Sequence, residues 1–164
     1  MARRLERIFR STSSARVRNR LGGAGRLASA TTRLHARLIR RSGGRIRRSF
    51  LFTGGMQVLV LTTTGRKSGK TRSTPLGYLR DGEAYAVLAA NAGADTPPAW
   101  WLNLQAEPNG EVTVDGRSMP VSGRRAPAEA ERRLWERFAE LNPAFGEYRN
   151  LTERQIPVVL LEPR

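Results

Sequence analysis

The chain has 164 residues, enough for one domain, and its 39% hydrophobic content can support a packed core. It has no cysteine and a single histidine, His35, which excludes disulfides, thiolate metal sites, cysteine nucleophiles and histidine-rich metal centres. Chemistry must therefore come from carboxylates, hydroxyls, tyrosines or a bound organic cofactor, and no metal is expected.

The formal net charge of +15 is concentrated near the N-terminus. Residues 1–48 hold 15 arginines and one acid, Glu6, whereas residues 49–164 hold 14 basic and 13 acidic side chains. The sequence therefore predicts an arginine-rich N-terminal arm over residues 1–48 and a nearly neutral folded domain over residues 49–164. The sequence contains no run of 18 or more apolar residues, so no membrane span is expected. It also lacks the apolar segment that is typical of a secretory signal.

The arm carries an apolar stripe between its arginines. Leu27, Thr31, Leu34 and Leu38 recur at helical spacing. Such an amphipathic basic helix suits an anionic membrane surface, where apolar side chains sink and arginines meet phosphates; packing on the domain is the alternative. Nucleic acid is a disfavoured partner because no aromatic side chains are interleaved for base stacking. The expected location is the cytoplasm, with the cytoplasmic face of the membrane as a candidate contact of the arm.

Short apolar segments separated by turn residues predict strands in the 49–164 domain. They are residues 57–63, 72–80, 83–91, 111–115, 117–122 and 156–161. Asp81-Gly82 and Asp115-Gly116 are two-residue hairpin signals, so successive strands are expected to pair antiparallel. Pro75 lies within the second segment and requires an edge or a bulge there, because proline has no backbone N–H.

Two segments have the pattern of helices. A short helix is expected from about residue 97, and a longer one from Pro127, where Leu134, Trp135 and Phe138 recur at helical spacing. Six strands, two helices and no strand–helix–strand alternation favour an α+β fold with a small antiparallel barrel. Closure of the barrel removes exposed strand edges, and the absence of alternation disfavours a dinucleotide-binding sheet.

A cationic turn follows the first predicted strand. Arg66, Lys67, Lys70 and Arg72 place four cations within seven residues of a nearly neutral domain. The turn has some features of a nucleotide-binding P-loop, but three residues separate its glycines where that loop needs four, and a strand follows instead of a helix. Its backbone N–H groups and neighbouring hydroxyls suit another anion, with a solvated hairpin tip as the alternative.

The residues around this turn resemble the signature of the deazaflavin-dependent nitroreductase family. The first matching block runs from Val58 to Arg72 and continues as Thr74-Pro75-Leu76. Further blocks are Pro98–Leu104 and Ile156–Val159. The resemblance extends from about residue 50 to the C-terminus in the family's order and spacing.

The resemblance implies a split β-barrel like that of pyridoxamine-phosphate oxidases, six-stranded and antiparallel, with flanking helices. It also implies coenzyme F420, an 8-hydroxy-5-deazaflavin that carries a phosphate and an oligoglutamate tail. A bacterial reductase of this kind passes a hydride from the reduced coenzyme to a small acceptor, such as a quinone, a nitroaromatic or another activated unsaturated compound. A non-catalytic F420 carrier and a related barrel that binds FMN are the alternatives. The oligomeric state is not predicted.

The resemblance also implies which residues contact the coenzyme. In the family, the turn and the arginine after it hold the phosphate and tail, which assigns that role here to Arg66, Lys67, Ser68 and Arg72. Three further segments are expected to lie along the coenzyme. They are Ser73, Thr74, Pro75, Leu76 and Gly77; Leu88, Ala89, Ala90 and Asn91; and Ala99, Trp100, Trp101, Leu102 and Asn103.

Several of these side chains have a second interpretation. The side chain of Trp100 or Trp101 is suited to cover an apolar ring system, although a tryptophan at such a position is more often part of the core. Asn91 and Asn103 have short amides that suit polar ring edges, or equally the capping of a turn or a helix.

On the acceptor side the sequence departs from family members that reduce nitroaromatic prodrugs. Those members have tyrosines where this chain has Asn142 and Phe145, and a serine where it has Ala90. Tyr148 is the remaining tyrosine of that group, and it is expected to donate a proton or to orient the acceptor. A half-buried aromatic with its hydroxyl in water is the alternative. The sequence therefore does not name the acceptor.

Overall fold

The computed structural model describes residues 56–164 of the chain. The predicted arm over residues 1–48, with its apolar stripe and its expected membrane contact, lies outside the described residues.

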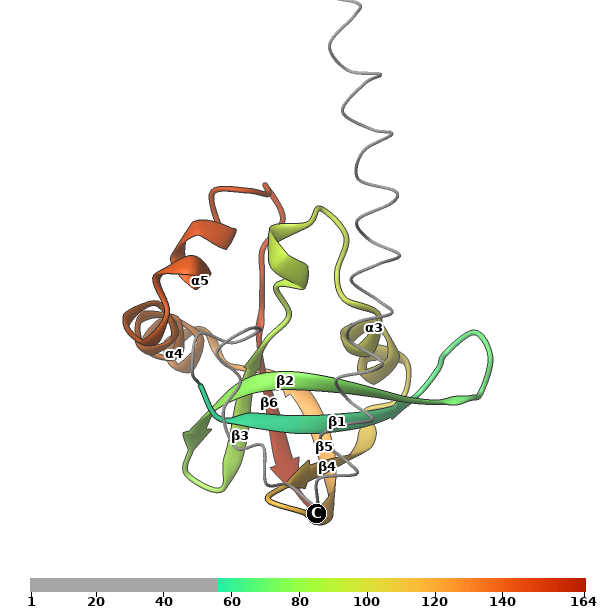
Figure 1. Cartoon of the computed structure of the whole chain (residues 1–164). Coiled ribbons are helices and arrows are strands. Elements are labelled where there is room, and N and C mark those ends of the chain that lie inside the picture. Colours follow the sequence, from blue (N-terminus) through green and yellow to red (C-terminus); the bar gives the residue numbers. More distant parts are fainter. Residues whose placement is uncertain (1–55) are drawn as a thin grey trace, which may run out of the picture.

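Six antiparallel strands close into a barrel (Figure 1). They are β1 (Val58–Thr64), β2 (Thr71–Asp81), β3 (Ala84–Leu88), β4 (Asn109–Val114), β5 (Arg117–Arg125) and β6 (Val158–Pro163). The strand order around the barrel is β1-β2-β3-β6-β5-β4, and β4 closes it by pairing with β1. The predicted six-stranded antiparallel barrel is therefore confirmed.

The helical elements connect the strands. They are the short turn η1 (Asn91–Gly93), α3 (Ala99–Ala106), α4 (Ala128–Leu141) and α5 (Pro143–Tyr148). In the view of Figure 1 they all lie on one side of the β1–β2 pair, with α3 nearest to the free end of that hairpin. Within residues 56–164, no helix is long and apolar enough to cross a membrane.

Strand β3 is buried on both faces and separates two hydrophobic clusters. Ala86 and Leu88 pack in one cluster, and Tyr85 and Val87 pack in the other, because side chains alternate along a strand. The first cluster includes Leu134, Trp135 and Phe138 from α4, and the second includes Trp100, Trp101 and Leu104 from α3. Each of the two predicted helices therefore covers its own core.

Strand β2 changes partner along its length. Residues 71–77 pair with β1, and residues 78–81 pair with β3. Pro75 pairs with Val60 in the first part, where β1 is its neighbour within the described sheet. Its missing N–H therefore disrupts no ladder on the other side of β2, which agrees with the predicted edge position.

Strand β3 is shorter than predicted. It ends at Leu88 rather than at Asn91, because the chain leaves the sheet and turns left-handed. The φ angles of Asn91, Ala92 and Gly93 are 49°, 53° and 75°. The predicted coenzyme segment Leu88–Asn91 is therefore a strand end followed by a turn.

Helix α5 was not among the predicted elements. Pro143 begins it, and the Asn142 side-chain oxygen accepts a hydrogen bond from the Ala144 N–H at 3.1 Å. A proline at the first helical position after an asparagine cap is a local start signal. Asn142 therefore has a structural role of its own.

Gly110 of β4 lies so close to β1 that it has no room for a side chain. A Cβ atom there would come within 2.8 Å of the Thr62 carbonyl oxygen. We expect Gly110→Ala to lower the free energy of unfolding by about 1–3 kcal/mol, since the backbone it meets cannot move aside, as measured by urea unfolding.

Gly146 provides the matched control. A Cβ atom there has its nearest neighbour at 4.0 Å, and alanine is favoured over glycine inside a helix. Gly146→Ala should be neutral or stabilising, and equal destabilisation by the two substitutions would contradict this view of the β1–β4 contact.

Candidate functional site

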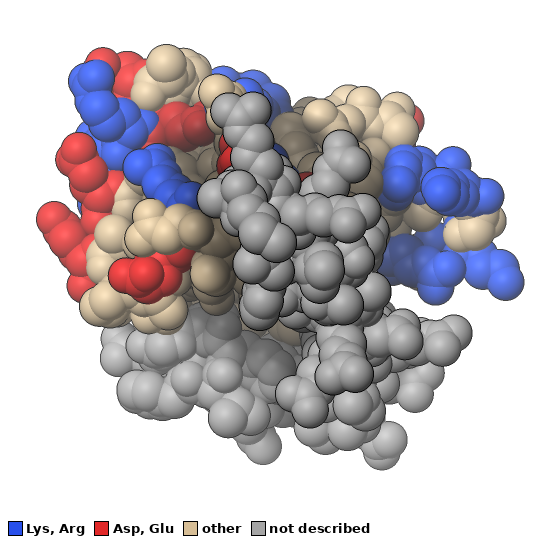
Figure 2. All heavy atoms as spheres, turned by 90° about the horizontal axis from the view of Figure 1, so that it is seen from above, with Lys and Arg blue, Asp and Glu red and all other residues tan. Residues whose placement is uncertain are grey.

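The four predicted cations lie at the free end of the β1–β2 hairpin, and all four side chains are exposed. The turn closes through the Gly65 N–H, which donates to the Lys70 carbonyl oxygen at 2.9 Å. Gly69, with a φ of 63°, donates its N–H to the Gly65 carbonyl oxygen at 2.7 Å. Figure 2 shows a patch of Lys and Arg side chains at this projecting end of the molecule.

These cations have no carboxylate partner among residues 56–164. The four ion pairs of that part of the chain use other arginines: Arg124–Glu162, Arg125–Glu131, Arg132–Glu129 and Arg133–Asp81. Like charges held close together repel one another, so a bound polyanion would stabilise the turn.

Helix α3 anchors the cationic turn through Asn103, whose side chain is 4% exposed. Its Oδ1 accepts from the Arg66 backbone N–H at 3.2 Å, and its Nδ2 donates to the Thr63 hydroxyl at 3.0 Å. The Arg66 guanidinium reaches the same Oδ1 at 3.5 Å. Both ends of this buried amide are therefore engaged in holding the turn to the barrel.

The neighbouring part of β2 is half-buried. Residues 73–77 are all of intermediate exposure, and Leu76 packs against the cluster under α3. The Thr62 and Ser73 hydroxyls lie 3.1 Å apart and link β1 to β2 just behind the turn. This predicted segment is thus contiguous with the cations and partly accessible.

The residues of α3 divide between the core and the surface. Trp100 and Trp101 are buried in the core under α3, with ring centroids 6.4 Å apart at an interplanar angle of 61°. Ala99 is exposed and Leu102 is half-buried. Both tryptophans thus occupy the core, the second of the two interpretations that their sequence pattern allows.

The segment after β3 is held by a residue that was not predicted, Arg154. Its Nη2 donates to the Ala89 carbonyl oxygen at 3.1 Å and to that of Ala90, and its Nε donates to that of Ala94 at 2.8 Å. Burial lowers the pKa of the Arg154 guanidinium, and the carboxylate of Asp95 acts in the opposite direction. No spacing rule distinguishes this arginine from the others in so arginine-rich a chain.

Tyr148 ends α5 and lies apart from the cationic turn. Its ring packs edge-on against Phe145 with centroids 5.6 Å apart, and Phe145 packs against Phe138 at 5.8 Å. Helix α5 contacts η1, whereas the hairpin end lies on the opposite side of the barrel in Figure 1. The structure therefore gathers the cations, β2 and α3 on one side and places Tyr148 on the other side of η1.

An open groove of about 520 Å³ lies between α4 and α5, away from these residues. Trp135, Ala139 and Gly146 line it, and the Arg149 guanidinium lies over the Trp135 ring at 4.0 Å from its centroid. None of the predicted site residues contributes to its lining. Among residues 56–164 no cluster of three or more potential metal ligands is found.

A family model described as F420H(2)-dependent quinone reductase matches residues 31–163. The chain belongs to this family. An F420H(2)-dependent quinone reductase of Mycobacterium tuberculosis is 36% identical over 135 residues, which cover 80% of this chain and 89% of that relative. The chain is therefore an oxidoreductase whose coenzyme is F420, as its motifs implied.

Solved structures agree with this membership. The structure of an F420H2-dependent reductase has 34% identity and a TM-score of 0.57, covering 64% of this chain and 93% of that one. A second solved chain, described as a domain-swapped dimer, has 28% identity and a TM-score of 0.57, covering 85% of this chain and 99% of its own.

Asn103→Ala should loosen the cationic turn and destabilise the domain. The Thr63 hydroxyl and the Arg66 N–H would lose a buried partner, which costs about 1–3 kcal/mol. We expect a lower urea midpoint and faster hydrogen exchange of the Arg66 amide. Asn109→Ala, an exposed asparagine of β4, is the control, and an Asn103→Ala variant as stable as this control would contradict the anchoring role.

Proposed function

We propose that this chain transfers a hydride from reduced coenzyme F420 to a quinone-type acceptor, and that the end of the β1–β2 hairpin binds the coenzyme's phosphate and tail. The observation that carries the proposal is the group of four exposed cations without carboxylate partners among residues 56–164, on a turn fixed by the buried Asn103. When bound, the coenzyme supplies the hydride, and the protein supplies binding, orientation and shielding.

The donors of the turn fit a polyanion. Arg66 and Arg72 offer planar guanidinium groups that bind phosphate or carboxylate in a bidentate manner, and Lys67 offers a compact point charge. Ser68 adds a hydroxyl close to the turn's backbone, since its Oγ accepts a hydrogen bond from the Lys70 backbone N–H at 3.4 Å. All of these groups are exposed, so their contacts are expected to weaken with salt.

The reacting ring would lie between the hairpin and η1. The segments proposed to border it are Ser73–Gly77 of β2, Leu88–Asn91 and the exposed side of α3 at Ala99 and Leu102. The core positions of Trp100 and Trp101 support α3 from below rather than covering the ring. Fixing the ring on these packed elements would give orientation, which is one of the contributions that a protein makes to hydride transfer.

On the acceptor side we propose that the Tyr148 hydroxyl orients the quinone or donates a proton to it. Helix α5, which carries Tyr148, contacts η1, and η1 follows the segment proposed to border the ring. Asn142 caps α5 and Phe145 packs against the core, so neither has the role of a tyrosine hydroxyl. Nitro reduction is therefore not part of this proposal.

Arg66→Ala combined with Lys67→Ala should weaken F420 binding about tenfold or more. Two exposed charge contacts of about 0.7 kcal/mol each correspond to that factor. The measurement is titration of the purified protein with F420, followed by deazaflavin fluorescence at two salt concentrations. The variant should also show a flatter dependence of affinity on salt.

The matched control removes the same charge elsewhere, through Arg117→Ala combined with Arg132→Ala. Arg117 lies at the β4–β5 turn and Arg132 on α4, and both are exposed. Equal weakening by both double variants would point to net charge rather than to the turn. No binding by the folded wild-type protein would overturn the proposal itself.

We propose in addition that the arm over residues 1–48 contacts an anionic membrane surface, where quinones dissolve. The support is its excess of 14 positive charges with an interleaved apolar stripe. The full chain should sediment with vesicles that contain anionic lipid, and a chain beginning at Ser49 should not. Equal sedimentation of the two chains would contradict this role of the arm.

A further inference from the structure

The turn after β3 has an uncommon backbone conformation. Asn91 and Ala92 are L residues with φ angles of 49° and 53°, and Gly93 continues the left-handed path at 75°. Asparagine tolerates a left-handed conformation, but alanine does not, so that of Ala92 persists only where the surrounding structure imposes it. Something outside the turn must therefore hold it.

The restraint comes from residues 151–154, about 60 positions further along the chain. Arg154 binds the carbonyl oxygens of Ala89, Ala90 and Ala94, which lie on both sides of the left-handed turn. A bond to carbonyl groups on either side of a turn fixes the distance between its ends. Arg154 thus clamps the turn at its base.

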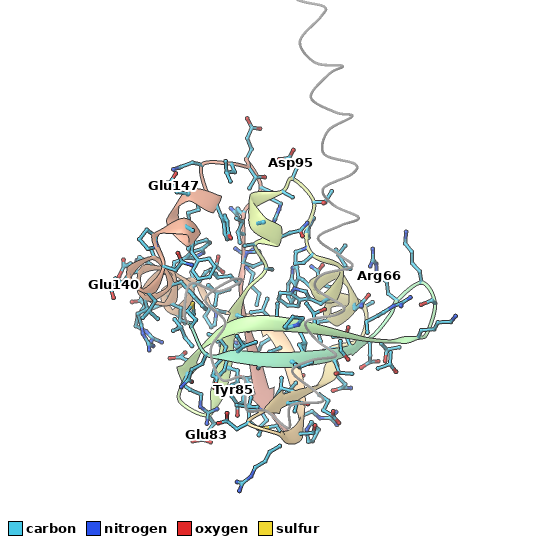
Figure 3. All side chains as sticks on the ribbon, viewed as in Figure 1. Arg66, Glu83, Tyr85, Asp95, Glu140 and Glu147 are labelled. Atoms are coloured by element: carbon cyan, nitrogen blue, oxygen red, sulfur yellow. The ribbon has the colours of Figure 1, made fainter. Side chains whose placement is uncertain are left out.

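Neighbouring contacts of the same segment complete the clamp. The Thr152 hydroxyl donates to the Asp95 carboxylate at 3.0 Å and accepts from the Arg154 N–H at 3.3 Å. A Cβ atom on Gly93 would lie 2.9 Å from the Leu151 side chain, so the turn and this segment are in close contact. Figure 3 shows Asp95 on the loop that leads from this turn toward α3.

The guanidinium group has capacity beyond these bonds. The Arg154 Nη1 is buried and has no hydrogen-bond partner among the described residues. A buried arginine nitrogen without a partner is costly, and a lysine or an apolar side chain would avoid that cost. What a guanidinium offers here is its planar fork, which reaches several carbonyl oxygens at once.

We propose that Arg154 is a positioning residue for the coenzyme's ring. By clamping the carbonyl groups of residues 89–94 it holds the turn in the left-handed form that borders the ring, and it acts through this backbone rather than by touching the tail. The inference rests on the proposed function, because it uses F420 binding as one of its readouts. It adds a residue that neither the motifs nor the family resemblance assign.

The clamp itself is tested without coenzyme. In Arg154→Met the Gly93 and Ala94 amides, which donate within the turn at 3.0 and 3.1 Å, should exchange hydrogen at least tenfold faster. Arg124→Met is the matched control, since Arg124 makes a two-bond ion pair with Glu162 between β5 and β6. Unchanged exchange of the two amides in Arg154→Met would overturn the clamp.

The effect on the coenzyme is tested with two ligands, whole F420 and the deazaflavin core that lacks the phosphate and tail. Arg154→Met should weaken binding of the core about tenfold and should keep the wild-type salt dependence of F420 binding, because the hairpin cations remain. The combined Arg66→Ala and Lys67→Ala variant should bind the core as tightly as wild type does, and its F420 binding should depend less on salt. A general loosening of the fold would weaken the binding of both ligands in both variants, so the two variants would not differ in this way.

The outcomes separate the two proposals. If the wild-type protein binds F420 and Arg154→Met binds the deazaflavin core as tightly as wild type does, the positioning role is wrong while the proposed function stands. If the wild-type protein binds neither ligand, the proposed function is wrong, whatever the exchange experiment shows. Arg154→Lys keeps the charge but reaches fewer carbonyl groups, so its amide exchange rates and its affinity for the core should lie between those of wild type and Arg154→Met. If the methionine variant unfolds, the same measurements are made on Arg154→Lys.

Discussion

Repulsion among the cations at the end of the β1–β2 hairpin has to be balanced by the rest of the structure. Two unit charges repel by about 1 kcal/mol at 4 Å in water, and more near a protein surface. A two-stranded hairpin end alone is too weakly held to keep such groups in one arrangement. The buried amide of Asn103 supplies the missing restraint, because it ties the Arg66 N–H to Thr63 and hence to the barrel. Helix α3 and its core therefore support the proposed anion site directly.

Local signals predicted much of this fold. Asp115 and Gly116 both have positive φ angles, as the two-residue hairpin that they predict requires, and the apolar segments became strands. Helix α5 also had a local signal, the asparagine cap before Pro143, but at six residues it is too short to show a helical periodicity. The end of β3 had none. It depends on Arg154, which lies 64 residues from Ala90, and a contact over such a separation leaves no periodicity in the sequence.

The family resemblance predicted segments better than individual side chains. Ala99–Asn103 does lie beside the cationic turn, yet a helix presents successive residues to different sides. Trp100 and Trp101 consequently point into the core, Ala99 is exposed, and Asn103 binds the turn. The side of the helix on which a residue lies decides whether it is available for coenzyme contact, core packing or anchoring. A motif match does not contain that information.

The two ends of the proposed site differ in physical character, and this difference predicts which kinetic quantity each controls. Contacts of the coenzyme at the exposed hairpin end would be the same before and during hydride transfer, so they would contribute uniform binding, which alters KM more than kcat. The backbone of residues 91–93 is left-handed, and Arg154 binds carbonyl groups on both sides of it, so in the proposed site it would determine how the ring is oriented at the moment of transfer. A salt-sensitive anchor at one end and a clamped turn at the other would allow the protein to capture a highly charged coenzyme without making its reactive geometry depend on ionic strength.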